Sequence, residues 1–232
     1  PARGGSKRLP RKNLLPLQGK PLIGWTIEAA IGAGLDRVFV TTENEEIADV
    51  SRSFGAEVLK RPIGLATDTV QLDEVYLFTV RQLLAEERIA EEDTLVLLAP
   101  TSPLRTAEHI RDAYRLYSTF QAANYTILGG YTDPMYHWRK SRISSLGYTE
   151  LESIKGFIPS SGERKGKQEY GNWMWPVVEN GSLYVLGCRK LTNNKTVRTT
   201  PIALYEMSPQ DSVDVDEISD LAYCQYLMSK DE

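Results

Sequence analysis

Short apolar runs of strand length alternate with longer amphipathic segments along most of the chain. Strands are predicted at residues 37–42, 57–59, 94–99, 124–129, 182–186 and 202–207, and helices at 21–31, 44–54, 69–87, 106–120 and 217–228. Repeated β-α-β alternation favours right-handed crossovers that place helices on both faces of a sheet. The sequence therefore predicts an α/β fold with a mostly parallel, doubly wound sheet.

The alternation stops between about residues 131 and 176. This excursion holds three of the four tryptophans, Trp138, Trp173 and Trp175, together with several lysines and arginines. Clustered aromatic rings often mark interfaces between proteins, so we expect an interaction arm here. No internal repeat or linker divides the sequence, and residues 1–232 are predicted to form a single domain that carries this arm.

The charge balance and the cysteine content narrow the class of protein. There are 27 basic and 31 acidic residues, a net charge of −4, which argues against nucleic acid as a partner. No apolar run reaches the roughly 18 residues of a membrane-spanning helix, which argues against a membrane protein. Cys188 and Cys224 are too few for a disulfide framework and match no zinc spacing. We therefore expect an enzyme of the reducing cytoplasm.

The first thirteen residues, P-A-R-G-G-S-K-R-L-P-R-K-N, are rich in glycine and in positive charge. Around Gly4, Gly5 and Ser6 the backbone N–H groups can approach an anion closely, and nearby cations neutralise it. These cations are Arg3, Lys7, Arg8, Arg11 and Lys12. The run has neither the G-K-[ST] ending of a Walker loop nor a G-x-G-x-x-G pattern. It predicts a phosphate cradle of another type, and the alternative is a solvated basic loop. Loops of this kind usually follow a strand, so we expect one ahead of Pro1.

A second candidate site lies near the end of the sequence, in S-V-D-V-D at residues 212–216. On an extended segment Asp214 and Asp216 point to the same face, about 7 Å apart. Paired carboxylates that face bound phosphates are common ligands of Mg²⁺. The pattern predicts a Mg²⁺ site, and the alternative is that Asp216 caps the last helix.

These motifs occur with others in a fixed order. The opening run is followed by G-K-P-L-I-G-W-T-I-E-A-A, L-A-T-D-T, P-T-S-P-L-R, E-N-G-S-L-Y and S-V-D-V-D. In this set, which extends from Pro1 to the last helix, the chain resembles the acylneuraminate cytidylyltransferase family, the CMP-sialic acid synthetases and their relatives. The resemblance implies a Rossmann-like fold of the nucleotide-diphospho-sugar transferase type, a dimerisation subdomain inserted at about 131–176, and a homodimer. It also implies a Mg²⁺-dependent reaction of CTP with a nine-carbon sugar acid, which yields a CMP-sugar and pyrophosphate.

The resemblance also assigns roles to individual residues. Arg3, Ser6, Lys7 and Lys12 would hold the triphosphate over Gly4 and Gly5, and Asn13 would bind cytosine. Arg61, Ala66 and Asp68 match a loop that lines the nucleotide pocket, and Asp214 and Asp216 match the Mg²⁺ ligands. Thr101, Asn180 and Tyr184 fall in motifs assigned to the sugar pocket, and Lys167 matches a cation that reaches the sugar carboxylate of the partner subunit. The expected catalytic residues are Arg3, Lys12, Asp214 and Asp216, because attack of the sugar's anomeric hydroxyl on the α-phosphorus redistributes charge over the phosphates. The proton acceptor stays open between Asp214, Asp216 and a metal-bound water.

Several positions depart from the family pattern. Ala99 stands where the family often has glutamine, and alanine offers no side-chain hydrogen bond. Val70 and Gln71 replace small hydroxyl residues, and Val178 stands where some members have arginine. These changes predict that the sugar substrate is a modified nonulosonic acid rather than sialic acid itself. The alternatives are another sugar acid or nucleotide, or an inactive nucleotide-sugar binding protein with the same fold.

Overall fold

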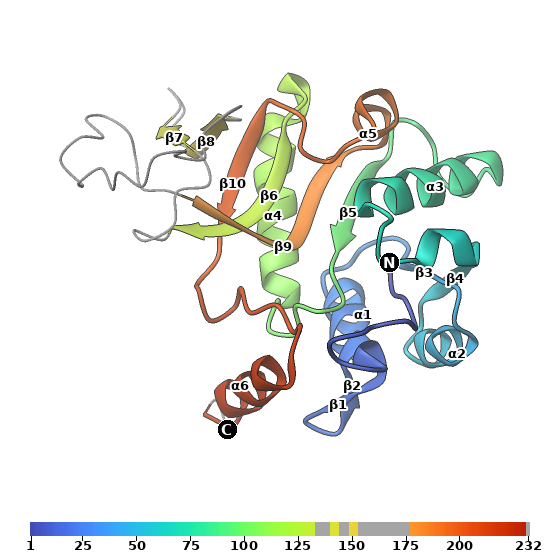
Figure 1. Cartoon of the computed structure of the whole chain (residues 1–232). Coiled ribbons are helices and arrows are strands. Elements are labelled where there is room, and N and C mark those ends of the chain that lie inside the picture. Colours follow the sequence, from blue (N-terminus) through green and yellow to red (C-terminus); the bar gives the residue numbers. More distant parts are fainter. Residues whose placement is uncertain (133–139, 144–148, 153–176, 231–232) are drawn as a thin grey trace, which may run out of the picture.

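The computed structural model describes residues 1–132, 140–143, 149–152 and 177–230 (Figure 1). In chain order its elements are η1 (Lys12–Leu14), β1 (Pro16–Leu17), β2 (Lys20–Pro21), α1 (Leu22–Gly32), β3 (Phe39–Thr42), α2 (Glu45–Ser53), β4 (Glu57–Lys60), η2 (Ile63–Ala66), α3 (Leu72–Ala85), β5 (Thr94–Leu98), α4 (Ala107–Phe120), η3 (Gln121–Ala123), β6 (Thr126–Thr132), β7 (Lys140–Ile143), β8 (Thr149–Glu152), β9 (Val177–Gly187), α5 (Cys188–Asn194), β10 (Ile202–Glu206) and α6 (Ile218–Met228). Each predicted helix and strand overlaps an element of the expected type. The sequence did not predict α5 or the short strands β1, β2, β7 and β8.

Two of the helices begin at side chains suited to capping. The Asn44 side chain accepts a hydrogen bond of 2.9 Å from the backbone N–H of Ile47 at the start of α2. Thr106 does the same for the N–H of His109 at the start of α4, at 3.3 Å. Such bonds satisfy N–H groups that the first turn of a helix leaves without partners. The sequence therefore determines locally where these helices start.

The α/β fold is as expected, but the main sheet is mixed rather than mostly parallel. Its strand order is β5-β9-β6-β10-β8-β7. Strands β6 and β10 are parallel, whereas β9 runs antiparallel to both β5 and β6. A strand that runs parallel to its neighbour needs a crossover connection, usually a helix. No helix is predicted in the 131–176 excursion that precedes β9, which is consistent with the antiparallel direction of β9. Strands β3 and β4 form a separate parallel pair.

Helices cover both faces of the main sheet (Figure 1). On one face Tyr184 and Leu186 of β9 pack in a cluster with α3 and α5. On the other face Leu183 and Val185 pack with α4. Because successive side chains of a strand point to opposite faces, β9 contributes to both cores. This arrangement confirms the predicted doubly wound layering.

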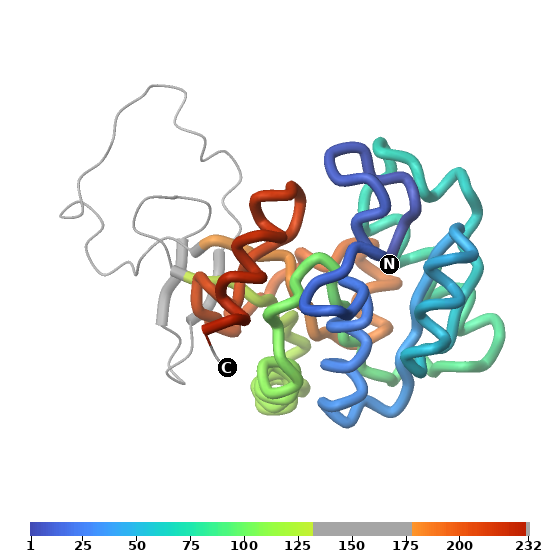
Figure 2. Tube along the Cα trace, turned by 90° about the horizontal axis from the view of Figure 1, so that it is seen from below, coloured from blue at the N-terminus to red at the C-terminus, as the bar shows by residue number. Residues whose placement is uncertain are grey.

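Helix α6 packs against the segment that follows the glycine-rich loop. Figures 1 and 2 show α6 close to the first turns of the chain. Leu17 and Leu22 pack in one cluster with Leu221 and Cys224 of α6. This packing brings the basic opening run and the S-V-D-V-D segment to the same side of the molecule.

The expected dimerisation arm at 131–176 lies largely outside the described residues. Within it, β7 and β8 form an antiparallel pair, and β8 lies beside β10 in the main sheet. In the part of the chain that the structure describes, no helix combines the length and the hydropathy needed to cross a membrane.

Candidate active site

The glycine-rich loop is anchored beside the carboxyl end of β3. The backbone N–H of Ala2 donates to the Thr41 carbonyl at 3.0 Å, and that of Gly4 donates to the Glu43 carboxylate at 2.7 Å. Arg61, which is 4% exposed, donates to the same carboxylate and to the Ala2 carbonyl. Arg61 thus holds the loop from the interior. Sequence reasoning missed Glu43, although it follows a buried strand at the end where α/β proteins bind ligands.

Gly4 and Gly5 have different surroundings. A Cβ on Gly4 would lie 2.7 Å from Nδ2 of Asn44, whereas a Cβ on Gly5 would meet no protein atom within 4 Å. The backbone N–H of Ser6 donates to the Gly4 carbonyl at 3.1 Å and closes a tight turn. The close approach of Asn44 therefore favours glycine at position 4, while Gly5 leaves the outer side of the turn open to an approaching anion.

One side of this cradle is closed by the loop that follows β4. Arg3 and Lys7 pair with the two carboxylate oxygens of Asp68 at 2.6 and 2.5 Å. Ala66 ends η2 in the same loop and is half-buried. The structure thus brings the 61–68 loop against the glycine-rich loop, as the sequence predicts.

The other side is closed by the S-V-D-V-D segment. Val215 is fully buried, so Asp214 and Asp216 lie on the outward face of the extended segment, as predicted. Lys12 Nζ donates to Asp216 at 2.8 Å, and Arg8 pairs with the same carboxylate. The N-cap of α6 is Glu217, so the alternative that Asp216 caps the last helix is wrong.

The two aspartates differ in pKa. Desolvation by the surrounding protein raises the pKa of Asp214, and the charge of Asp216 adds to this effect, against a hydrogen bond from the Thr101 side chain. Desolvation also acts on Asp216, but Lys12 and Arg8 outweigh it and hold its pKa below the ordinary value. Asp214 is nonetheless exposed to solvent. Its carboxylate is therefore accessible to a ligand and lacks a cationic partner as close as Lys12 is to Asp216.

A metal ion at this pair would need ligands from a substrate. Among the described residues, no group of three or more His, Cys, Asp or Glu side chains is arranged to hold a metal. Two carboxylates completed by phosphate oxygens and water are a usual environment for Mg²⁺. The oxygen donors of Asp214 and Asp216, beside a cradle of cations, fit that requirement.

Asn13 lies inside the cradle and is 5% exposed. Its Nδ2 donates to the Arg3 carbonyl at 3.0 Å, while its buried Oδ1 has no partner among the described residues. An unsatisfied buried acceptor is costly. Asn13 therefore both holds the backbone at Arg3 and offers an acceptor to a donor group of a ligand.

Arg105, which sequence reasoning missed as a functional residue, is 1% exposed. Its guanidinium donates to the carbonyls of Ser182 and Ala99, at 2.6 and 3.0 Å, and to the Thr26 hydroxyl at 2.9 Å. Desolvation lowers the pKa of Arg105 to about 10. These bonds join α1, β9 and the 99–105 loop, which carries Thr101 to Asp214. No local pattern distinguishes such a buried arginine from an exposed one.

The residues predicted to contact the sugar have different surroundings. Thr101 lies against Asp214, as described above. Asn180 Nδ2 donates to the Ser212 hydroxyl at 2.8 Å, two residues before Asp214. Tyr184 is 1% exposed and its hydroxyl donates to the Glu179 carboxylate. The predicted Lys167 lies outside the described residues.

A charged cluster that the sequence did not predict adjoins Tyr184. Arg198 pairs with Glu179 at 3.0 Å and also donates to the Tyr184 hydroxyl at 3.3 Å. The backbone N–H of the preceding Val197 donates to Asp73 at 3.1 Å, in the first turn of α3 and shortly after Asp68. Val197, next to Arg198, is thus bonded to the start of α3, and Glu179 precedes Asn180, which bonds to Ser212.

Comparison with known proteins decides the family. A family model described as cytidylyltransferase matches residues 1–134, more than half of the chain. The chain belongs to the cytidylyltransferase family. N-acylneuraminate cytidylyltransferase B of Danio rerio is 32% identical over 215 residues, 93% of this chain and 47% of that protein. CMP-N,N'-diacetyllegionaminic acid synthase of Legionella pneumophila is 32% identical over 236 residues, 98% of this chain and 94% of that protein. The chain spans about half the length of several curated relatives that it matches.

Solved structures share the fold of this chain. CMP:2-keto-3-deoxy-manno-octonic acid synthetase, complexed with CTP, aligns with a TM-score of 0.69 and 18% identity over 100% of this chain and 97% of the other. A 4-diphosphocytidyl-2C-methyl-D-erythritol synthase aligns with a TM-score of 0.60 and 13% identity over 94% of each chain. These similarities establish a Rossmann-like α/β fold.

Proposed function

We propose that this cytidylyltransferase joins CTP to a sialic-acid-like nonulosonic acid and releases pyrophosphate. The observation that carries the proposal is the position of the glycine-rich cradle between Asp68 on one side and the Asp214–Asp216 pair on the other. The names of the Danio rerio and Legionella pneumophila relatives support a sugar acid of this class.

Arg3, Lys7 and Lys12 would bind the triphosphate of CTP, together with the backbone N–H groups around Gly5 and Ser6. In the structure these cations pair with Asp68 and Asp216. Asp68 faces two cations, so that group keeps a net positive charge that attracts an anion. On the other side, Lys12 and Arg8 pair with Asp216 and offset the charges of the two aspartates. The unpartnered Oδ1 of Asn13 would accept a hydrogen bond from the amino group of cytosine.

The anomeric hydroxyl of the sugar acid would attack the α-phosphorus, and pyrophosphate would leave in line. Because charge is redistributed over the phosphates, catalysis would rest on positioning and on stabilisation by Arg3 and Lys12. Asp214 and Asp216 would hold Mg²⁺, which when bound supplies further positive charge to the phosphates.

We assign the sugar side of the site to Thr101 and to the cluster of Glu179, Tyr184 and Arg198. Ala99 has no polar side chain, and its carbonyl is held by Arg105 at 3.0 Å, so the sugar would be bound from these other positions. A homodimer in which the 131–176 arm brings Lys167 to the partner's site is part of the same proposal. So is a cytoplasmic location, which the free thiols of Cys188 and Cys224 support.

The test is pyrophosphate release from CTP, with and without Mg²⁺, in the presence of a panel of nonulosonic acids and one octulosonic acid. We expect Mg²⁺-dependent release with at least one nonulosonic acid, and none with ATP, GTP or UTP in place of CTP. Release with the octulosonic acid alone would assign the related sugar-acid activity. Binding of CTP without turnover of any acid would show that the chain is a binding protein.

A further inference from the structure

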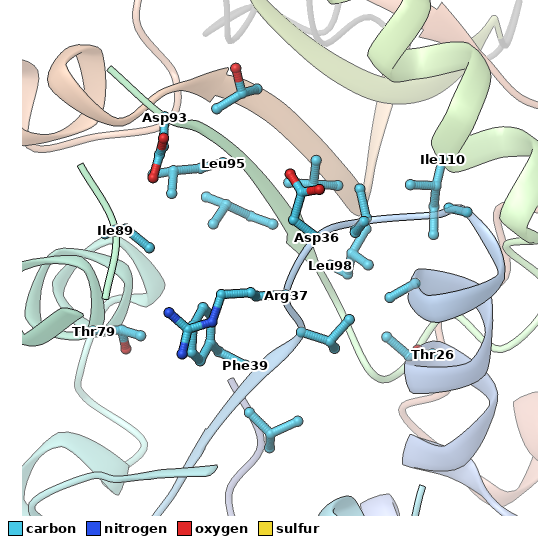
Figure 3. A pocket seen from close by; sticks show the side chains of 18 of the residues that line it. Thr26, Asp36, Arg37, Phe39, Thr79, Ile89, Asp93, Leu95, Leu98 and Ile110 are labelled. Atoms are coloured by element: carbon cyan, nitrogen blue, oxygen red, sulfur yellow. The ribbon is translucent and has the colours of Figure 1, made fainter. Parts of the chain in front are cut away.

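The loop between β5 and α4, residues 99–105, is held from the interior of the molecule. Its first carbonyl, that of Ala99, accepts hydrogen bonds from the buried Arg105 guanidinium at 3.0 Å and from the Thr26 hydroxyl at 3.3 Å. Figure 3 shows Thr26 on α1, facing the end of β5 at Leu98. Because one carbonyl is bonded both to a buried charge and to a neighbouring helix, the start of this loop has little freedom to move.

Thr101 of this loop is bonded twice to the S-V-D-V-D segment. Its carbonyl accepts from the backbone N–H of Val215 at 2.8 Å, and its hydroxyl donates to the Asp214 carboxylate. Leu104 of the same loop packs against the cluster that contains the fully buried Val215. The loop therefore holds this segment by a backbone bond, by an apolar contact and by one side chain that reaches a carboxylate.

The two aspartates of this segment are oriented by different kinds of donor. Asp216 pairs with the cations Lys12 and Arg8, which offset its charge. Asp214 is exposed and accepts from the neutral Thr101 hydroxyl. A neutral donor restricts the orientation of a carboxylate and still leaves its full negative charge available to a cation.

We propose that Thr101 is a positioning residue for the metal pair, because its hydroxyl fixes the Asp214 carboxylate in the orientation that a divalent cation needs. This inference rests on the proposed function, in which Asp214 and Asp216 hold Mg²⁺. That ion demands nearly ideal octahedral geometry, so a ligand of fixed orientation favours binding. Hydrogen bonds to carboxylate ligands commonly serve this purpose, and their loss typically weakens metal binding about 10- to 100-fold.

The same bond limits what Thr101 can offer to a sugar. A hydroxyl has one proton, and that of Thr101 is used for Asp214. Toward the sugar acid, the Thr101 oxygen would therefore act as an acceptor, for a hydroxyl or an amide N–H group of the substrate.

The test measures the affinity for CTP by calorimetry, once with Mg²⁺ and once with EDTA, and always without a sugar acid. Neither turnover nor a sugar contact then enters the readout. Thr101→Val keeps the branched side chain and the backbone bond to Val215 but removes the hydroxyl. We expect it to weaken CTP binding by at least about tenfold with Mg²⁺ and to leave binding with EDTA unchanged. Thr101→Ser, which retains a hydroxyl, should restore most of the loss.

Ser102→Ala is the matched control in the same loop. Ser102 is 1% exposed, and its hydroxyl has no partner among the described residues, so its removal should leave both affinities unchanged. Equal affinities of Thr101→Val and the unsubstituted chain with Mg²⁺, or an equal loss with Mg²⁺ and with EDTA, would overturn the inference alone. CTP binding by the unsubstituted chain that does not depend on Mg²⁺ would overturn the metal assignment of the proposed function, and this inference with it.

Discussion

Substitution of Gly4 and Gly5 by alanine separates the structural role of the cradle from its binding role. Neither residue has a positive φ, so alanine is compatible with the backbone at both positions. A methyl group at position 4 would lie 2.7 Å from Nδ2 and 3.1 Å from Cβ of Asn44, while one at position 5 would meet nothing within 4 Å. Asn44 is not free to move without cost, because its Oδ1 caps α2 at Ile47.

The contact with Asn44 sets the expected loss of stability in Gly4→Ala. Displacing Asn44 forfeits an N-cap worth about 1 kcal/mol, and the remaining overlap adds strain, so Gly4→Ala should lower the free energy of unfolding by about 1–2 kcal/mol. For a domain of this size the corresponding fall in Tm is about 2–8 °C. Gly5→Ala should leave Tm unchanged or slightly higher, since alanine restricts the unfolded chain more than glycine does.

Thermal unfolding and CTP titration measure the two effects. We expect Gly5→Ala to bind CTP at least about tenfold more weakly, because its methyl group projects where the phosphates approach the backbone. In the Gly4→Ala/Asn44→Gly double variant, the cost of Gly4→Ala should nearly vanish, because the whole Asn44 side chain, including its Cβ, is gone. Additive losses of stability in that cycle would refute the steric explanation. Unchanged CTP affinity in Gly5→Ala would refute the backbone approach.

Four further predictions address the carboxylates and the cysteines. Asp216→Asn should remove Mg²⁺-dependent pyrophosphate release while changing Tm by less than about 3 °C, since its ion pairs are partly exposed; normal turnover would contradict its assignment. Glu179→Gln should raise the KM for the sugar acid by about tenfold and leave that for CTP unchanged, and a shift in the CTP value alone would argue against a sugar contact. Arg37 and a second arginine lower the pKa of Glu57 to about 2. Because the Glu57 side chain is 41% exposed, solvent screening limits its contribution to the free energy of unfolding to about 1 kcal/mol. Since the pKa is lower in the folded state, urea unfolding should show this contribution above about pH 4.5 and its loss toward pH 2. Burial raises the pKa of both thiols to about 11, so a thiol reagent at pH 8 should label them only after unfolding.

Local patterns in the sequence were sufficient for most of the secondary structure. Asn44 and Thr106 mark helix starts in the sequence because a capping side chain acts on N–H groups two or three residues away. The alternation in S-V-D-V-D predicted that Asp214 and Asp216 share one face, since the strand period acts on neighbouring residues. Strand direction was not predictable in this way, because no local sequence pattern near β9 indicates which strands it pairs with.

The sequence by itself determined the α/β class, the composition of the cradle and the presence of an aspartate pair. Only the tertiary structure decided that Lys12 meets Asp216, 204 positions away, and that Glu43 and Arg61 hold the cradle from the interior. It also decided that Arg105 is buried with its charge bound to backbone carbonyls, and that Arg198 joins Glu179 and Tyr184. Helical and strand periods reflect interactions a few residues apart, whereas an ion pair or a buried arginine depends on which elements pack side by side, and that is settled by burial of apolar surface across the whole chain.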